Sequence, residues 1–494
     1  MTLDTFAPAA VPFSNVVYQQ LGGAHWDKLQ GWFAGLANRN YGEVNLVCLG
    51  DSTIEGNGAT AYNRAFPPML QTALNNRWVT EALATHGRGW LSPLPSPSET
   101  TYTDTYVTVT GPSTGPTPVN GFGVGERTYD ISTGYAGSTG SDTSPAAHAG
   151  LTGSYFVPPA GTYTVSWAVE LSGTLASADD NNFQLIYNST VLATSVNGHT
   201  AGTYEQDPVT VTTDGTNGIY IGTAGNNATT GAVYTGIIDP GTTFIYDLDG
   251  TSAFIFWVSQ PGGGDWKYSV DGGLYSTVMT ANSSTADGNV TSVTLGSSGA
   301  HTLRIKYAGS GPAYVSGLIE CNGDESSGIQ VHNGGNSGTT SGDWYSNYNS
   351  SGADIPCAGI AVFDPNLIII CLGNNDFNTS VPVLTFQANL SNFIALLQTA
   401  CATAPGGPGT AVPILLIAGP LDATADAAAW QQYVIAMYAI AAGSDLIDVY
   451  DMTLRFPAAD ATQTWGMINL GDGEFSDLGY SAVADSLCDF LSSS

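Results

Sequence analysis

The sequence predicts a mixed α/β fold in which a parallel sheet, covered by helices on both faces, is interrupted by a large β-sandwich insertion. Short apolar runs alternate with helical patterns near both ends of the 494-residue chain. Between residues 98 and 324, runs of Thr, Val and Tyr alternate with clusters of Gly, Ser, Asn and Asp, without helical period. Because the α/β pattern returns at residue 325, we expect both ends of the chain to form one domain.

The first elements are expected to be a helix, a strand and a second helix. Residues 21–39 place apolar side chains at helical spacing. The run VNLVCLG, residues 44–50, is short, continuous and apolar, which is typical of a strand buried on both faces. Residues 63–78, NRAFPPMLQTALNNRW, resume a helical pattern. We therefore assign residues 1–97 to the first part of the α/β domain.

The central segment is too long for one small sandwich. We divide it near DPGTT, residues 239–243, so that residues 98–150 and 241–324 form a jelly-roll-like β-sandwich and residues 151–240 a second sandwich nested within it. The segment is rich in Tyr and Trp, and most of these side chains are expected in cores because one face of each sheet is buried. Trp266, in the glycine-rich run GGGDWKYS, is the best candidate for an exposed ring that stacks on sugars.

Residues 325–494 are expected to complete the α/β domain, with strands and helices in alternation. The predicted strands are SGIQVHNGG, PNLIIICLGNND, VPILLIAGP and LIDVYDM, and the predicted helices are FQANLSNFIALLQTA, AAAWQQYVIAMYAIA and SDLGYSAVADSLCDFL. Ser476 is placed as the N-cap of the last helix.

The composition argues against several classes of partner. Lys and Arg number 10 against 41 Asp and Glu, a net charge of −31 that repels nucleic acid and anionic membranes. No window has the length of a membrane span, and MTLDTFAPAAVPF lacks the basic start and apolar core of a signal peptide. We therefore expect a protein made in a cytoplasm without secretion or membrane insertion. The six cysteines form no CxxC pair, and no metal or cofactor is expected.

Three polar turns follow apolar strands. They are Gly50-Asp51-Ser52, the run NGGNSG that contains Gly338, and Gly373-Asn374-Asn375-Asp376. In a parallel sheet such turns meet at the carboxyl edge, where α/β proteins place their sites. A hydroxyl, a backbone donor and an amide side chain are the parts of an acyl-transfer site, with Ser52 as nucleophile and Gly338 and Asn375 as oxyanion donors. The alternative is that the glycines only allow tight turns.

These motifs, in this order, resemble the SGNH (GDSL-type) hydrolase family over about residues 30–90 and 325–494. The resemblance implies a flavodoxin-like α/β/α sheet, with Ser52 as nucleophile and Gly338 and Asn375 in the oxyanion hole. The run GWFAGLANRNYGEVNLVCLGDSTIEGNGAT also resembles the opening of GDSL-type minor tail proteins of phages that infect actinobacteria. That resemblance implies a virion tail protein, with other tail proteins and a polysaccharide or acylated glycan of the host cell envelope as its partners.

The general base of that family is missing. The family ends with Asp-x-x-His before the last helix, whereas this chain has Glu474 at the histidine position and Gly471, followed by Asp472, at the aspartate position. No histidine follows His332. A glutamate of ordinary pKa, ~4.3, is a weak base for a serine hydroxyl. Activity could be kept in two ways. Burial of Glu474 beside Asp472 could raise its pKa enough for it to act as the base, or His332 could lie close enough to Ser52 to act as the base instead. The third possibility is an inactive site.

Three functions therefore remain open from the sequence. The first is a tail protein that contacts envelope glycans and, where the site is active, cleaves acyl esters through Ser52. The second is a working carbohydrate or lipid esterase, secreted or cellular. The third is a purely structural or adhesive module on a hydrolase scaffold. The missing histidine favours adhesion over catalysis.

Overall fold

The structure is a computed structural model. It describes residues 25–79, 87–93, 102–110, 129–130, 138–142, 150–156, 161–171, 183–194, 202–214, 216–223, 234–239, 243–273, 275–309, 311–323, 327–349, 355–419, 427–454, 466–468 and 474–492.

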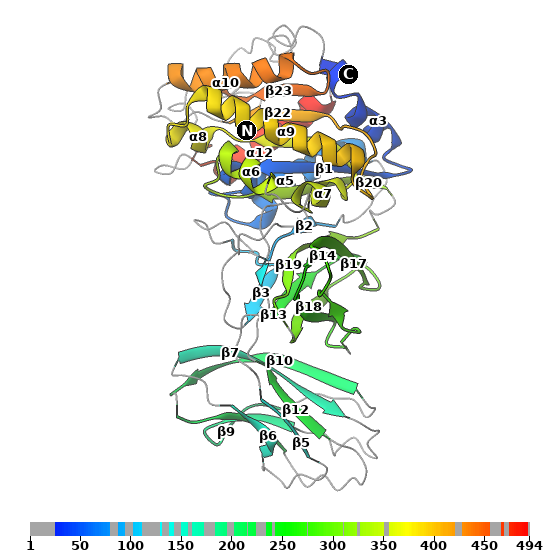
Figure 1. Ribbon diagram of the computed structural model, residues 1–494, viewed down its shortest axis with the longest axis vertical. Coiled ribbons are helices and arrows are strands. Elements are labelled where there is room, and N and C mark those ends of the chain that lie inside the picture. Colours follow the sequence, from blue (N-terminus) through cyan, green and yellow to red (C-terminus); the bar gives the residue numbers. More distant parts are fainter. Residues whose placement is uncertain are drawn as a thin grey trace, which may run out of the picture.

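A five-stranded parallel sheet joins the two ends of the chain (Figure 1). In chain order its strands are β1 (Glu43–Gly50), β20 (Gly328–Gly335), β21 (Pro365–Cys371), β22 (Ile414–Ala418) and β23 (Ile447–Asp451). The spatial order is β20-β1-β21-β22-β23, and every neighbouring pair is parallel. This 2-1-3-4-5 order is that of flavodoxin-like folds, so the predicted fold class is confirmed.

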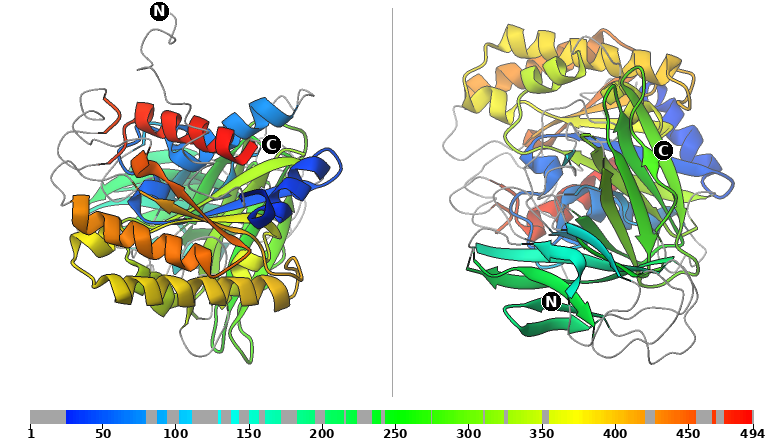
Figure 2. Two further views of the ribbon diagram at one scale, coloured as in Figure 1. Left: turned by 90° about the horizontal axis from the view of Figure 1, so that it is seen from above. Right: turned by 60° about the horizontal axis from the view of Figure 1, so that its bottom comes forward.

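Helices cover both faces of this sheet (Figure 2). Leu46 and Cys48 of β1 point into one core with helices α3 (Gln30–Asn38), α5 (Phe66–Trp78) and α12 (Asp477–Ser492). Val47 and Leu49 point into the opposite core, with helices α6 (Ser341–Tyr348), α7 (Ile355–Ala361), α9 (Val383–Thr403) and α10 (Ala427–Ala442). Because successive strand residues face opposite sides, a strand buried on both faces must be apolar throughout. The short helices are α2 (His25–Lys28), α4 (Ser52–Glu55), η2 (Tyr62–Arg64), α8 (Asn374–Asn378) and η4 (Met452–Leu454).

The described residues from 102 to 323 form strands and turns without a helix, as the sequence predicts. Two antiparallel sheets lie next to the α/β part. The first contains β16 (Met279–Thr280), β15 (Asp265–Val270), β18 (His301–Gly309), β13 (Thr243–Leu248) and β3 (Val107–Thr110). The second contains β17 (Asp287–Thr294), β14 (Ser252–Ser259), β19 (Tyr314–Cys321) and β2 (Gly89–Leu91), with β4 (Tyr129–Asp130) also paired to β19.

Two further antiparallel sheets form the outer β module, at the bottom of Figure 1. One contains β10 (Gly202–Thr213), β7 (Gly161–Leu171), β12 (Tyr234–Asp239) and β5 (Ser138–Asp142), and the other β6 (Gly150–Phe156), β11 (Ile219–Thr223), β8 (Phe183–Tyr187) and β9 (Thr190–Thr194). The strands depart from the predicted boundaries in two places. β2 joins the inner β sheets although it precedes residue 98, and β5 joins the outer sheets although it precedes residue 151.

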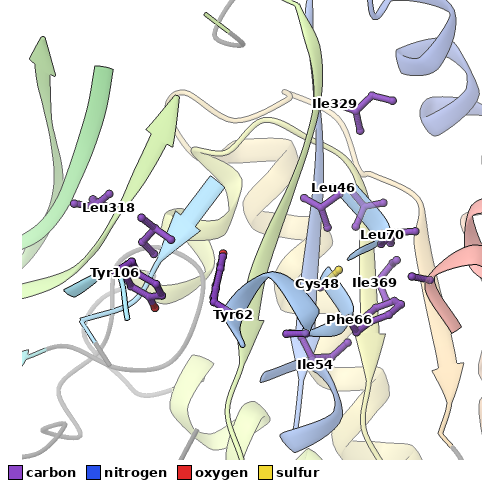
Figure 3. Close-up of a cluster of buried hydrophobic side chains, with 14 of the residues drawn as sticks. Leu46, Cys48, Ile54, Tyr62, Phe66, Leu70, Tyr106, Leu318, Ile329 and Ile369 are labelled. Carbon is purple, nitrogen blue, oxygen red and sulfur yellow. The ribbon is translucent and has the colours of Figure 1, made fainter. Parts of the chain in front are cut away.

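The core of the α/β part continues into the inner β sheets without a break. Figure 3 shows side chains of one buried cluster running from Ile369 and Leu70, through Tyr62, to Tyr106 and Leu318. The outer module has a separate small core around Trp167 and Ile221. The inner sheets therefore share a hydrophobic core with the α/β domain and do not form a separate domain joined by a linker.

The expectation of an exposed Trp266 was wrong. Its ring lies on β15 with 0% of its surface exposed, edge-on to Trp257 at 5.4 Å between ring centroids. The glycines before it allow close backbone approach instead, since a Cβ on Gly264 would lie 1.9 Å from the Gly311 carbonyl oxygen. The run of glycines before Trp266 therefore reflects close packing of the backbone and not an exposed loop.

Candidate active site

Ser52 is the first residue of helix α4, directly after the end of β1. Asp51 caps this helix, because its carboxylate accepts the Thr53 N–H at 3.1 Å, and its own N–H donates to the Cys371 carbonyl at 3.2 Å. Ser52 is half-buried, and its hydroxyl makes no hydrogen bond to any part of the chain that is described. The hydrogen bonds of the neighbouring Asp51 thus fix the backbone at Ser52, and the Ser52 hydroxyl is left without a partner among the described residues.

Glycines at the strand ends permit unusually close packing. A Cβ on Gly50 would lie 2.2 Å from the Cys371 carbonyl oxygen, and one on Gly335 would lie 1.9 Å from the Glu55 nitrogen. Gly56 and Gly58 have φ of 99° and 87°, as expected for turn glycines. Gly50 is needed for a different reason than the sequence suggested, because it makes room for the neighbouring strand.

The loop after β20 lies against the Ser52 turn. Gly50 pairs with Gly335 in the sheet, and the Asn336 N–H donates to the Gly50 carbonyl at 2.8 Å. Gly338 adopts the left-handed conformation with φ of 77°, and open space surrounds the position of its missing Cβ. Among the described residues, the backbone N–H groups of Gly338 and Ser52 have no hydrogen-bond acceptor.

The third turn supports this loop from the other side. The Asn375 amide nitrogen donates to the Thr339 carbonyl at 2.9 Å, which uses one of its two N–H groups. Asp376 is fully buried and accepts hydrogen bonds from the Ser341 backbone N–H at 2.9 Å and the Ser341 hydroxyl at 2.6 Å. The turns that follow β1, β20 and β21 therefore meet at one edge of the sheet and bring Ser52, Gly338 and Asn375 into one region.

This arrangement has the parts that acyl transfer requires. A serine hydroxyl lies at a helix N-terminus, where unpaired N–H groups favour developing negative charge. The N–H groups of Ser52 and Gly338 and the second N–H of Asn375 are candidate donors to an oxyanion, each typically worth ~10²–10³ in rate. The catalytic roles of these residues remain predictions.

Two buried carboxyl groups lie beneath the site. Asp51 is 1% exposed, and one of its oxygens, Oδ2, has no hydrogen-bond partner among the residues that the structure describes. Burial, opposed by hydrogen bonds from Thr53 and assisted by the charge of Asp376, raises the pKa of Asp51 to about 7. Burial also raises the pKa of Asp376, although the hydrogen bonds from Ser341 oppose that shift. Burial therefore favours the protonated forms of these two carboxyl groups.

Glu474 lies near the same edge, just before α12. Burial and then the charges of Asp51 and Glu474 raise the pKa of the Cys371 thiol, at the end of β21. Tyr480 is also within range of the Glu474 charge, and its hydroxyl donates to the Asn57 carbonyl at 2.7 Å. A role for Glu474 as the base stays a prediction. Asp472 and Gly471 lie outside the described residues.

The start of α12 is tied to the loop that follows α4. Asp477 accepts the Thr60 N–H at 2.8 Å and the Thr60 hydroxyl at 2.7 Å, and its carboxylate pairs with Arg64 at 3.1 Å. Ser476 caps the helix, as predicted, by accepting the Gly479 N–H at 3.3 Å. These contacts hold the segment next to Glu474 against the Ser52 loop.

His332 is not placed to replace the missing histidine. It pairs with Val47, three residues before the end of β1, which puts its Cα ~10 Å short of the strand end. Its Nε2 bonds the Asn45 amide oxygen at 3.0 Å, nearer the amino end, and its ring meets Phe363 at 4.6 Å. Burial lowers the pKa of this imidazole to about 3. His332 is therefore a neutral core residue.

Sequence reasoning missed two residues that shape the site. Glu55 ends α4, and its carboxylate accepts the backbone N–H of Ser337. Tyr102, from the segment that leads into β3, donates its hydroxyl to the Glu55 carbonyl at 2.9 Å. Glu55 lies three positions after Ser52, a helical spacing that was available in the sequence. Nothing in the sequence linked Tyr102, 50 residues further on, to this turn.

The comparisons with known proteins concern the fold and the later part of the chain. Residues 284–482 match the model of the GDSL-like lipase/acylhydrolase family. No curated protein matches the chain. A solved peptidoglycan O-acetylesterase has a similar fold, with 13% identity, a TM-score of 0.51, and coverage of 94% of this chain and 95% of that one.

Two further solved structures share less of the chain. A family two carbohydrate esterase from Clostridium thermocellum has 16% identity and a TM-score of 0.25, covering 51% of this chain and 91% of its own. A lipase/acylhydrolase from Enterococcus faecalis has 17% identity and a TM-score of 0.25, covering 33% and 76%.

The α/β part of the chain is thus similar to esterase-like hydrolases in its fold and in the segment that the family model matches. The family model supports a similarity to GDSL-type hydrolases over residues 284–482, and the solved O-acetylesterase supports the similarity of the fold. The matched segment does not include Ser52, because the β insertion separates β1 from the later strands. β1 lies outside the matched segment, but it belongs to the same sheet, because it pairs with β20 and β21.

Proposed function

We propose that the protein is a phage tail-associated protein that contacts acylated glycans of the host cell envelope and removes acyl groups through Ser52. The observation that carries the catalytic part is the Ser52 turn. Within the described residues, the Ser52 hydroxyl and the backbone N–H groups of Ser52 and Gly338 make no hydrogen bond, and the Asn375 amide donates to the Thr339 carbonyl. Few structural roles require that combination at the carboxyl edge of a sheet.

In the proposed reaction, the Ser52 Oγ attacks the ester carbonyl while its proton passes to the Glu474 carboxylate. The N–H groups of Ser52, Gly338 and Asn375 stabilise the oxyanion. Collapse of the tetrahedral intermediate releases the glycan hydroxyl, which takes up a proton, and leaves an acyl-serine that water hydrolyses. Because a carboxylate is a weaker base than imidazole for this step, slow turnover is expected.

The choice of glycan rests on charge and architecture. A chain of net charge −31 repels polyanions, which favours an uncharged sugar as substrate. The similarity to a peptidoglycan O-acetylesterase extends over the β modules as well as the α/β part. The tail location rests on the resemblance of the first strand and its flanks to phage minor tail proteins. Among the described helices, none is long and apolar enough to cross a bilayer.

An adhesive module without turnover is the second candidate. The position of His332 in the core favours it, because that histidine does not supply a base to Ser52. Acetate release from O-acetylated peptidoglycan and from p-nitrophenyl acetate, compared between wild type and Ser52→Ala, separates the two functions. Release that Ser52→Ala abolishes supports the esterase. Equal sedimentation of both proteins with cell walls, without any acetate release, supports the adhesin.

A further inference from the structure

Glu55 connects four segments at the edge of the candidate site. Its N–H donates to the Asp51 carbonyl at 3.0 Å, within the turn that carries Ser52. Its carbonyl accepts the Tyr102 hydroxyl at 2.9 Å and the Asn333 amide at 3.3 Å, and its carboxylate accepts the Ser337 N–H. The esterase reaction, as derived above, assigns no task to this carboxylate.

The contact with Ser337 fixes the Asn336–Ser337 peptide, which is one peptide before the one that carries the Gly338 N–H. The loop is held at two successive residues, because the Asn336 N–H donates to Gly50 and the Ser337 N–H to Glu55. Gly338 follows with φ of 77° and open space around it, so its own packing does not define where its N–H points. The residue after Gly338 is also held, because the Thr339 hydroxyl donates to the Asn336 carbonyl at 2.6 Å and the Asn375 amide donates to the Thr339 carbonyl. The orientation of the Gly338 N–H therefore depends on anchors on both sides, and Glu55 provides one of the two before it.

We propose that Glu55 is a positioning residue that aims the Gly338 N–H at the oxyanion formed on Ser52. This inference rests on the proposed esterase function of the same site. Glu55 acts through the loop and not on the proton, since the Ser52 hydroxyl makes no hydrogen bond to it within the described residues.

The test is the rate at which a fluorophosphonate labels Ser52, located by mass spectrometry, in the full chain. Glu55→Ala should slow labelling by ~10²-fold, the typical effect of losing one oxyanion donor. Glu55→Gln keeps an acceptor of the same reach and should lose less than about tenfold. Glu55→Asp keeps the charge but withdraws it by one methylene, and should behave like Glu55→Ala. Glu43→Ala, at the opposite end of β1, is the matched control for loss of a carboxylate.

The order of the variants decides the outcome. Labelling that falls from wild type through Glu55→Gln to Glu55→Asp supports the proposal, and this comparison holds even if Glu55→Ala fails to fold. Faster labelling of Glu55→Asp than of Glu55→Gln would mean that charge and not reach matters, which overturns it. Equal rates in all folded variants also overturn it, even if deuterium exchange at residues 337–340 rises. Wild type that is not labelled at Ser52 overturns the esterase function and this role together.

Discussion

At the scale of single residues, the site is built on groups whose ordinary behaviour is altered by burial. Asp51 is the clearest case, because it is 1% exposed and one of its oxygens has no hydrogen-bond partner in the described part of the chain. It caps helix α4, because its carboxylate accepts the Thr53 N–H. Its burial depends on the strands on either side of β1, which the sequence places about 280 residues or more away.

The raised pKa of Asp51 predicts a stability that depends on pH. The folded protein binds this proton more tightly than the unfolded chain, so stability falls as pH rises from about 4 through about 7 and then levels off. Asp51→Asn keeps the cap without a charge. It should stabilise the protein at pH 8 by on the order of 1–4 kcal/mol and have little effect at pH 4. Denaturant unfolding at both pH values measures this, and a gain that is equal at both would contradict it.

At the scale of elements, glycine is needed at the strand ends for two reasons, lack of space for a side chain and a left-handed backbone. The sequence alone does not show which reason applies at which position. Gly50 and Gly338 belong to similar polar turns, yet one faces a backbone oxygen and the other faces open space. Turn chemistry predicts a positive φ equally for both. Only the pairing of β1 with β21 shows that Gly50 has no room for a side chain.

Alanine substitutions at these two glycines should therefore differ. Gly50→Ala puts a Cβ 2.2 Å from the Cys371 carbonyl oxygen and should cost on the order of 3 kcal/mol or more. Gly338→Ala meets no atom within 4 Å and should cost only about 1–2 kcal/mol, for the left-handed backbone. Thermal unfolding of both variants checks this. A Gly338→Ala protein that is less stable than Gly50→Ala would disprove the assignment.

A second element-scale prediction concerns the turns beside β18. The two ring nitrogens of His301 bond the Asp271 carboxylate and the Ser297 carbonyl, both at 2.8 Å, so only the doubly protonated ring satisfies both acceptors. The Ser297 carbonyl and then Asp271 raise the pKa of His301. For Asp271, burial opposes the shift, but the hydrogen bonds from His301 and Thr302 lower the pKa.

The His301 contribution to stability is larger at low pH than at high pH, which is the opposite of the trend in acid denaturation. A raised imidazole pKa gives stability that is fully present below its unfolded value of ~6.5 and is lost as pH rises through the folded value. The Asp271 contribution is constant above pH 5.5, because that carboxyl titrates at lower pH. His301→Ala should thus lower the melting temperature more at pH 5.5 than at pH 8. Calorimetry at both values decides it, and a larger loss at pH 8 would refute the charged pair.

At the scale of the whole molecule, the sequence anticipated the sheet, its two helical layers and the β insertion, because each depends on local periodicity. It did not anticipate that the core would run from the parallel sheet through Tyr62 and Tyr106 into the inner β sheets (Figure 3). That continuity depends on contacts between segments that have no shared sequence signal. The same reason explains why Trp266 and Tyr102 were misjudged or missed.

The last prediction concerns the base of the proposed reaction. If Glu474 takes the proton from Ser52, esterase activity should rise with pH through the pKa of that carboxylate, and Glu474→Gln should reduce it by ~10²–10⁴-fold, the usual range for a general base. Acetate release measured across the pH range, with Ser52→Ala as the blank, tests this. Unchanged activity in Glu474→Gln would exclude Glu474.

Restoring the histidine provides the complementary experiment. Glu474→His alone should not raise activity, because Gly471 leaves the imidazole without a carboxylate to set its tautomer and orientation. Glu474→His with Gly471→Asp should raise it, because the orienting group returns with the base. Wild type that already turns over at the ~1–10³ per second of ordinary enzymes would show that a carboxylate suffices at this site. In that case, the chain would have exchanged a histidine base for a carboxylate base and kept its esterase activity.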